Sequence, residues 1–141
     1  AKLMQKKIMV PLGPEIRDLK SVHYALAAAE RLQAAVIILR FADGHELRPT
    51  WLEETLTDLI ASARLAGLQM TVVEGNGAPE REVINVADQE RINLLVFSED
   101  QRRLERRVLA LAPRLGHMII QVKEKDAMNL STEEGGSRWQ S

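Results

Sequence analysis

The chain contains no cysteine, and this absence excludes disulfides, thiol catalysis and cysteine-bound zinc. It has no apolar run that approaches the length of a membrane span. Residues 2–9 lack the long apolar stretch and the cleavage site of a signal peptide. The formal net charge of -1 gives no general attraction to nucleic acid or to acidic membranes. We therefore expect a cytoplasmic protein with no nucleic-acid partner and no direct membrane insertion.

The composition is that of an ordinary globular domain. Hydrophobic residues make up 45% and charged residues 28% of the 141 residues, which is enough for one domain with a full core. After residue 125 the sequence turns polar and glycine-bearing. We therefore expect a folded domain over residues 1–125 and a flexible polar tail over residues 126–141.

Two kinds of apolar segment alternate along the chain. Short apolar runs bounded by turn residues predict strands at residues 8–12, 35–41, 69–74, 94–97 and 118–122. Between these runs, apolar residues recur at helical spacings. Strict alternation of strand and helix indicates a parallel sheet with right-handed crossovers. The prediction is an α/β fold in which a doubly wound, five-stranded parallel sheet carries helices on both faces.

Local signals set the expected limits of the helices. The first helix is expected within residues 15–33. Thr50 and Glu53 match a capping box that would open the second helix, and Gly67 is placed to end it. Pro79 suits the first position of the third helix. The fourth helix is expected to bury an apolar stripe formed by Leu104, Val108, Leu111 and Leu115.

Three segments carry a resemblance to the universal stress protein family. KKIMVPLG at residues 6–13 resembles the family's KKILVPVDGS start. GAPEREVINVADQERINLLVFS at residues 77–98 resembles its Gly-x-Pro helix and following Asp-Leu-Ile-Val-Met-Gly strand, with Asn93 in place of the Asp and Ser98 in place of the Gly. HMIIQV at residues 117–122 resembles the closing strand. The resemblance implies strand order 3-2-1-4-5, with a switch point between strands 1 and 4 where ligands bind in open α/β sheets.

The glycine-rich phosphate loop of the family's ATP-binding branch is missing. That branch carries Gly-x2-Gly-x9-Gly-Ser/Thr after its fourth strand, whereas no glycine lies between Ser98 and Gly116 here. Gly13 stands where the family has an Asp after its first strand. The chain therefore resembles the branch that does not bind ATP. The residues that match the family's ligand site in character are Pro11 and Leu12.

The segment that replaces the loop starts with a second capping box, formed by Ser98 and Gln101. Glu99 and Asp100 lie in the first turn, where carboxylates favour the positive end of the helix dipole. Each would oppose a bound triphosphate by on the order of 1 kcal/mol. The alternative, that these two acids bind metal or act in acid/base chemistry, has no neighbouring histidine in the sequence to support it.

Four arginines follow on one side of the fourth helix, and they have two interpretations. They could bind an anion such as a nucleotide phosphate, or they could form the solvated face opposite the apolar stripe, which we favour. No aromatic residue interleaves with them, so base stacking is unsupported. These residues are Arg102, Arg103, Arg106 and Arg107.

The remaining candidates give weaker signals. Gly75-Asn76-Gly77 could approach a phosphate, but turn geometry explains two glycines equally well. His23, His45 and His117 are scattered and lack metal-ligand spacing. No nucleophile elbow is present. Trp139 lies in the polar tail, and the sequence does not decide whether it packs against a partner.

The last strand is expected to lie at the edge of the sheet. It is apolar and has neither proline nor internal charge, and such an edge invites pairing with another chain. The resemblance implies homodimers joined along this strand, and an isologous twofold contact would suit it. Alternatively, the tail or Lys123 and Lys125 cover it. We favour the dimer, with the interface formed by Met118, Ile119, Ile120, Gln121 and Val122.

Three hypotheses about function remain. The first is a non-enzymatic stress-response or regulatory module that acts as a dimer through protein contacts, with no cofactor, metal or catalytic residue. The second is a sensor of a nucleotide or another anion, with a site formed by Pro11, Leu12, Gly13, Phe41, Ser98, Arg102 and Arg103. The third is a cytosolic regulatory domain of a larger protein such as a transporter, which a chain that begins at Ala1 permits.

Overall fold

The protein is described by a computed structural model that covers residues 5–41 and 49–123. The predicted tail at residues 126–141, with Trp139, and the loop that contains His45 lie outside the described residues.

Five parallel strands form a single sheet in the order β3-β2-β1-β4-β5. The strand order, the parallel pairing and the five-stranded sheet confirm the predicted fold. In register, Pro11 of β1 lies opposite Leu39 of β2, and Ile8 of β1 lies opposite Leu94 of β4. The strands are β1 (Lys7–Leu12), β2 (Ala35–Phe41), β3 (Met70–Gly75), β4 (Leu94–Ser98) and β5 (Ile119–Val122).

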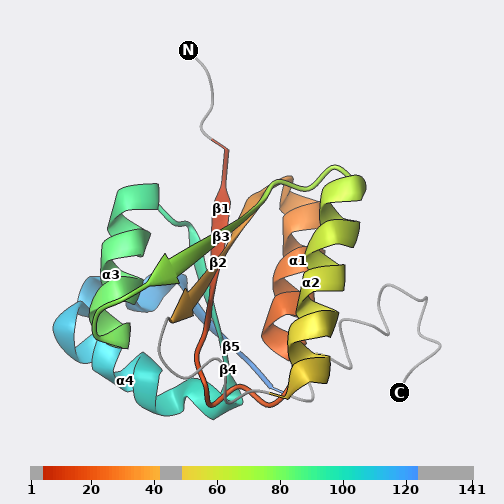
Figure 1. Ribbon diagram of the computed structural model, residues 1–141. Coiled ribbons are helices and arrows are strands. Elements are labelled where there is room, and N and C mark those ends of the chain that lie inside the picture. Colours follow the sequence, from red (N-terminus) through yellow and green to blue (C-terminus); the bar gives the residue numbers. More distant parts are fainter. Residues whose placement is uncertain (1–4, 42–48, 124–141) are drawn as a thin grey trace.

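Helices cover both faces of the sheet, as Figure 1 shows. Helices α1 (Lys20–Leu32) and α2 (Thr50–Leu65) lie on one face. Helices α3 (Pro79–Glu90) and α4 (Arg102–Leu111) lie on the other. A short 3-10 turn, η2 (Glu99–Gln101), leads from β4 into α4, and a second, η3 (Pro113–Met118), leads from α4 into β5. None of the helices within the described ranges is both long and apolar enough to cross a membrane.

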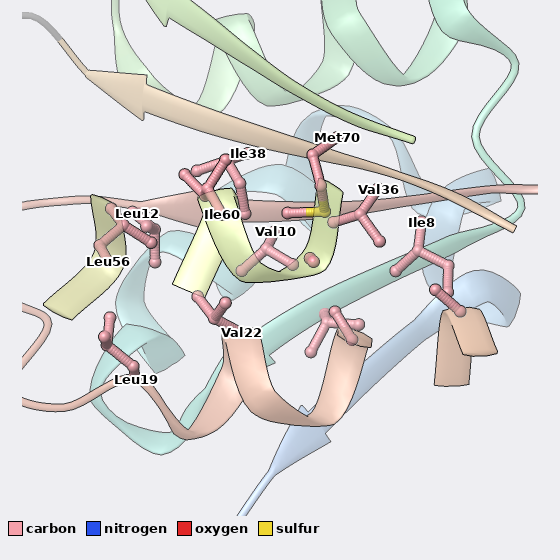
Figure 2. Packing of buried hydrophobic residues seen from close by; sticks show 14 of the residues in the cluster. Ile8, Val10, Leu12, Leu19, Val22, Val36, Ile38, Leu56, Ile60 and Met70 are labelled. Atoms are coloured by element: carbon pink, nitrogen blue, oxygen red, sulfur yellow. The ribbon is translucent and has the colours of Figure 1, made fainter. Parts of the chain in front are cut away.

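The sheet separates two apolar cores, because successive side chains of each strand point to opposite faces. On the α1 and α2 face, Val10 and Ile38 pack against Val22 of α1 and Ile60 of α2 (Figure 2). On the other face, a second cluster includes Met9, Leu39, Phe41, Phe97 and Val108. Burial on both faces explains why β1, β2 and β4 read as continuous apolar runs.

Helix α1 begins later than the sequence suggests. Ile16 and Leu19 are buried at 1% and 6% exposure, as the apolar pattern predicts, but they belong to the segment that leads into the helix. The backbone N–H of Lys20 donates to Asp18 Oδ1 at 3.0 Å. This bond satisfies one of the free N–H groups of a first helical turn, and it fixes the helix start at Lys20.

The predicted capping box at Thr50 is wrong. Thr50 is the first helical residue of α2, and the extended residue before the helix is Pro49, which offers no side-chain cap. Glu53 has a different partner, because its Oε1 lies 2.6 Å from Nη2 of Arg40 on β2. The acid that the pattern assigned to the helix start therefore ties α2 to the sheet.

The predicted stripe of α4 is also only partly correct. Leu104 and Val108 are buried, but Leu111 is 51% exposed and Leu115 belongs to η3. Pro113 cannot donate a helical hydrogen bond and disfavours helical geometry at the residue before it, so α4 ends at Leu111. In η3, Arg114 donates to Asp88 of α3 at 2.9 Å, and this hydrogen bond and the Asp88 charge raise the pKa of Arg114.

Candidate functional site

The order of the strands reverses between β1 and β4, which lie side by side in the sheet. The helix that follows β1 covers one face, and the helix that follows β4 covers the other (Figure 1). The two chain segments therefore diverge beyond the carboxyl ends of these strands. Such a divergence is the place where open α/β sheets bind ligands.

Gln101 joins the two strands at this point. The backbone N–H of Ser98, at the end of β4, donates to Gln101 Oε1 at 3.1 Å. Gln101 Nε2 in turn donates to the carbonyl of Pro11 on β1 at 2.9 Å. Both bonds are buried, and the Gln101 residue is only 1% exposed. The side chain thus bridges β1 and β4 across the switch point.

Both halves of the predicted capping box at Ser98 are present, since the Ser98 side chain faces the Gln101 backbone N–H and the Gln101 side chain accepts from the Ser98 N–H. The Ser98 side chain takes the matching position, but its Oγ is buried without a hydrogen-bond partner of ordinary geometry among the described residues. Ser98 is 2% exposed, so this hydroxyl is a buried polar group beside the bridge. A buried hydroxyl without a regular hydrogen bond is costly, and Ser21 Oγ is another such group in the fold.

A cleft of about 420 Å³ opens next to this bridge. Its size lies within the range of small-molecule sites. It runs between the start of α3 and the first turns of α4, at the carboxyl end of β2. The lining residues are Glu15, Phe41, Pro79, Asp100, Gln101, Arg102, Arg103, Leu104 and Arg107.

The charges of the cleft are mixed and favour anions. Arg102, Arg103 and Arg107 line it, against the carboxylates of Glu15 and Asp100. The three arginines are exposed, so their guanidinium groups are accessible from solvent. A guanidinium presents a planar set of donors that fits two oxygens of a phosphate or carboxylate.

Solved structures match the chain over most of its length. A universal stress protein in complex with cAMP is 19% identical with a TM-score of 0.60, over 84% of this chain and 97% of that chain. The chain has the universal stress protein fold. The universal stress protein from Archaeoglobus fulgidus in complex with dAMP is 16% identical with a TM-score of 0.60, over 86% of this chain and 100% of that chain. Another structure of universal stress protein from Archaeoglobus fulgidus is 16% identical with a TM-score of 0.58, over 85% of this chain and 95% of that chain. No protein-family model and no curated protein matches.

Within this universal stress protein fold, only some of the predicted ligand residues meet in the cleft. The cleft is lined by Phe41, Arg102 and Arg103. Phe41 is only 4% exposed and contributes apolar surface to the cleft. Arg107 lines it as well, whereas Arg106, also exposed on α4, is not among the lining residues. The predicted residues that are buried and do not line the cleft are Pro11, Leu12, Gly13 and Ser98.

Glu15 is one of the lining residues that the predicted ligand site did not include, together with Pro79, Asp100, Gln101, Leu104 and Arg107. The Glu15 carboxylate folds back over Gly13, where an added Cβ would come within 2.5 Å of Glu15 Oε1. The absence of a side chain at Gly13 leaves the space that the Glu15 carboxylate occupies. Gly13 directly after the strand and an acid two residues later were the available signals. They were not sufficient, because the direction of the loop is set by tertiary packing.

The Gly75-Asn76-Gly77 loop packs against a carboxylate. An added Cβ at Gly75 would lie 3.0 Å from Glu82 Oε1, and one at Gly77 would lie 2.9 Å from Glu82 Oε2. The close approach of the Glu82 side chain explains both glycines. A phosphate at this loop would meet a negative charge, so the turn interpretation is the better one.

Strand β5 lies at the edge of the universal stress protein sheet, as expected. Met118, Ile119, Ile120 and Gln121 are half-buried, while Val122 is fully buried in the core. Gln121 Nε2 donates to Glu105 of α4 at 2.8 Å, so this side chain is held within the chain. Beside the strand lies an apolar groove of about 350 Å³, lined by Tyr24, Ala28, Arg31, Leu32, Leu94 and Ile120.

The histidines within the described ranges do not form a site. His23 on α1 and His117 in η3 are both exposed. Within residues 5–41 and 49–123, no group of three or more His, Cys, Asp or Glu residues is arranged to hold a metal ion.

Proposed function

We propose that the chain is a non-enzymatic binding module that takes up a small ligand with a single phosphate group in the cleft of the switch point. The observation that carries this proposal is the position of Arg102, Arg103 and Arg107 around a cleft at the carboxyl edge of the sheet. Clefts at this edge are the usual ligand sites of open α/β folds. The anion-sensor hypothesis therefore has more structural support than a module that works through protein contacts alone.

The other lining groups favour a nucleoside monophosphate over a bare anion. Glu15 can accept hydrogen bonds from sugar hydroxyl groups, the role that acidic residues take toward ribose in dinucleotide sites. Phe41 and Pro79 offer apolar surface to a base or to a sugar face. Two of the neighbouring universal stress proteins were solved with cAMP and with dAMP, and each of these ligands carries one phosphate.

The same cleft is poorly suited to a triphosphate. Asp100 lines it and Glu99 is exposed beside it, so the added charges of a polyphosphate meet two carboxylates. The segment after β4 has no glycine at which backbone N–H groups could surround a phosphate chain. We therefore expect the affinity for AMP to exceed that for ATP.

Titration with AMP, dAMP, cAMP and ATP tests the proposal. Calorimetry should detect binding of the monophosphates. A ligand concentration of about one hundred times Kd should increase the free energy of unfolding by about 2.7 kcal/mol, and the melting temperature should rise accordingly. Sodium sulfate at equal ionic strength is the control for unspecific anion effects. Failure of all three monophosphates to bind at millimolar concentration would refute the proposal.

We also propose that the chain acts as a stress-response or regulatory module in the form of a homodimer. The exposed edge of β5 and the apolar groove that continues from Ile120 onto α1 support a homodimer joined along this strand. Leu32, at the rim of that groove, is 48% exposed, which leaves apolar surface for a partner to cover. In such a dimer, ligand binding in the two clefts would change how the dimer binds its protein partners.

A further inference from the structure

We infer that Gln101 limits the ligand of this cleft to a single phosphate, because its side chain fills the crevice into which a second phosphate would extend. The inference rests on the proposed function, since it specifies which ligands the same site accepts. It makes Gln101 a specificity-determining residue that belongs both to the wall of the cleft and to the bridge between β1 and β4.

The first step is that the Gln101 side chain is already hydrogen-bonded to the backbone groups of Ser98 and Pro11, at the ends of β4 and β1. Its Oε1 accepts the Ser98 N–H, a backbone donor that a phosphate oxygen could otherwise take. Its Nε2 donates to the Pro11 carbonyl, so the amide is fixed at both ends. The residue is only 1% exposed, so its side chain is buried between the two strand ends.

The second step is that removal of this side chain would expose two donors. The Ser98 N–H loses its acceptor, and the buried Ser98 Oγ beside it makes no hydrogen bond of regular geometry among the described residues. Both could donate to a phosphate oxygen, whereas the freed Pro11 carbonyl can only accept and would bind water. The crevice is therefore a potential phosphate subsite that one side chain closes.

The third step is the position of the arginines relative to this closed crevice. Arg102 and Arg103 follow Gln101 directly and face the same cleft. A single phosphate can lie against their guanidinium groups while Gln101 stays in place. The second group of a diphosphate gains no donor in the crevice, which is filled, and is repelled where it lies near Asp100.

Two substitutions distinguish whether the volume of the Gln101 side chain or its hydrogen bonds exclude the second phosphate. Gln101→Ala removes the side chain, whereas Gln101→Met loses the same two hydrogen bonds but keeps a chain of similar length. Calorimetric titrations with AMP, ADP and ATP in magnesium-free buffer give the ratio of the ADP and AMP dissociation constants for each protein. Circular dichroism confirms that each variant is folded, and Gln101→Ser serves as a second opening variant should Gln101→Ala not fold.

In the wild-type protein, ADP should bind about tenfold more weakly than AMP, because its second phosphate is kept out of the crevice and repelled by Asp100. Gln101→Ala or Gln101→Ser should bring the two affinities within about threefold of each other. Gln101→Met should keep the wild-type ratio. A ratio that Gln101→Ala leaves unchanged, or that Gln101→Met shifts as much, would overturn the inference. If the wild-type protein binds no AMP, the proposed function itself fails and the inference falls with it.

Discussion

The arginines of α4 differ in whether they reach the cleft, although all four are exposed. Arg107 lines the cleft, and Arg106, its neighbour in the chain, does not. Arg107→Ala should weaken AMP binding about tenfold, because a charge-assisted hydrogen bond contributes roughly 1.5–3 kcal/mol. Arg106→Ala removes the same formal charge and should change the Kd by no more than about twofold, in line with a screened surface charge. Calorimetry on both variants checks this; equal losses would mean that only net charge matters.

We expect Glu15 to contact the sugar of a bound nucleotide and not its phosphate. Its carboxylate lines the cleft and lies over Gly13. If it accepts a sugar hydroxyl, Glu15→Ala should weaken AMP binding by roughly fivefold to tenfold, the value of one such hydrogen bond. Inorganic phosphate has no sugar, and loss of a nearby negative charge should leave its affinity equal or slightly higher. Competition titrations measure both ligands. Parallel losses for AMP and phosphate would contradict the assigned role.

At the scale of elements, the strands, the start of α3 at Pro79 and the end of α2 before Gly67 were predictable, whereas the start of α1 and the end of α4 were not. Runs such as residues 35–41 are apolar on both faces, because helices cover both sides of the sheet, and this gives an unambiguous pattern. Helix α2 does start at Thr50, but the predicted capping box is absent because Glu53 pairs with Arg40, a contact between elements that the local sequence does not encode. The Gln101 half of the capping box was predictable, but its bond to Pro11 joins residues 90 positions apart.

Asn93 directly precedes β4 and lies at the start of its pairing with β1. It occupies the position of an Asp in the universal stress protein pattern that the sequence resembles. Asn93 Oδ1 accepts the Lys7 N–H at 2.8 Å, and the Asn93 N–H donates to the Lys7 carbonyl at 2.9 Å. Asn93→Ala should lower the free energy of unfolding by about 1 kcal/mol, because one hydrogen bond is lost at an exposed position.

Chemical denaturation measures that loss. Asn93→Asp keeps an acceptor oxygen and should retain most of the stability. Asn85→Ala, at an exposed position of α3, is the matched control and should not destabilise. A neutral Asn93→Ala variant would show that the strand pairing does not depend on this side chain.

At the scale of the whole molecule, the sheet has two edges, and they differ in character. Strand β3 exposes Thr71 and Val72 on its surface, whereas the first three residues of β5 are half-buried, and Ile120 among them lines the apolar groove beside α1. A partner that pairs with β5 could therefore cover apolar side chains as well as free main-chain groups. This favours β5 as the dimer edge.

Light scattering after size exclusion should accordingly give the mass of a dimer for the wild-type protein. Ile120→Lys should give a monomer, because a charge would have to be buried in the contact between the strands. Val72→Lys makes the same change on the other edge strand, where Val72 is 37% exposed, and it should leave the dimer intact. Thermal unfolding of both variants shows whether each chain is still folded. A wild-type monomer at high concentration, or a dimer that only Val72→Lys dissociates, would refute assembly through β5.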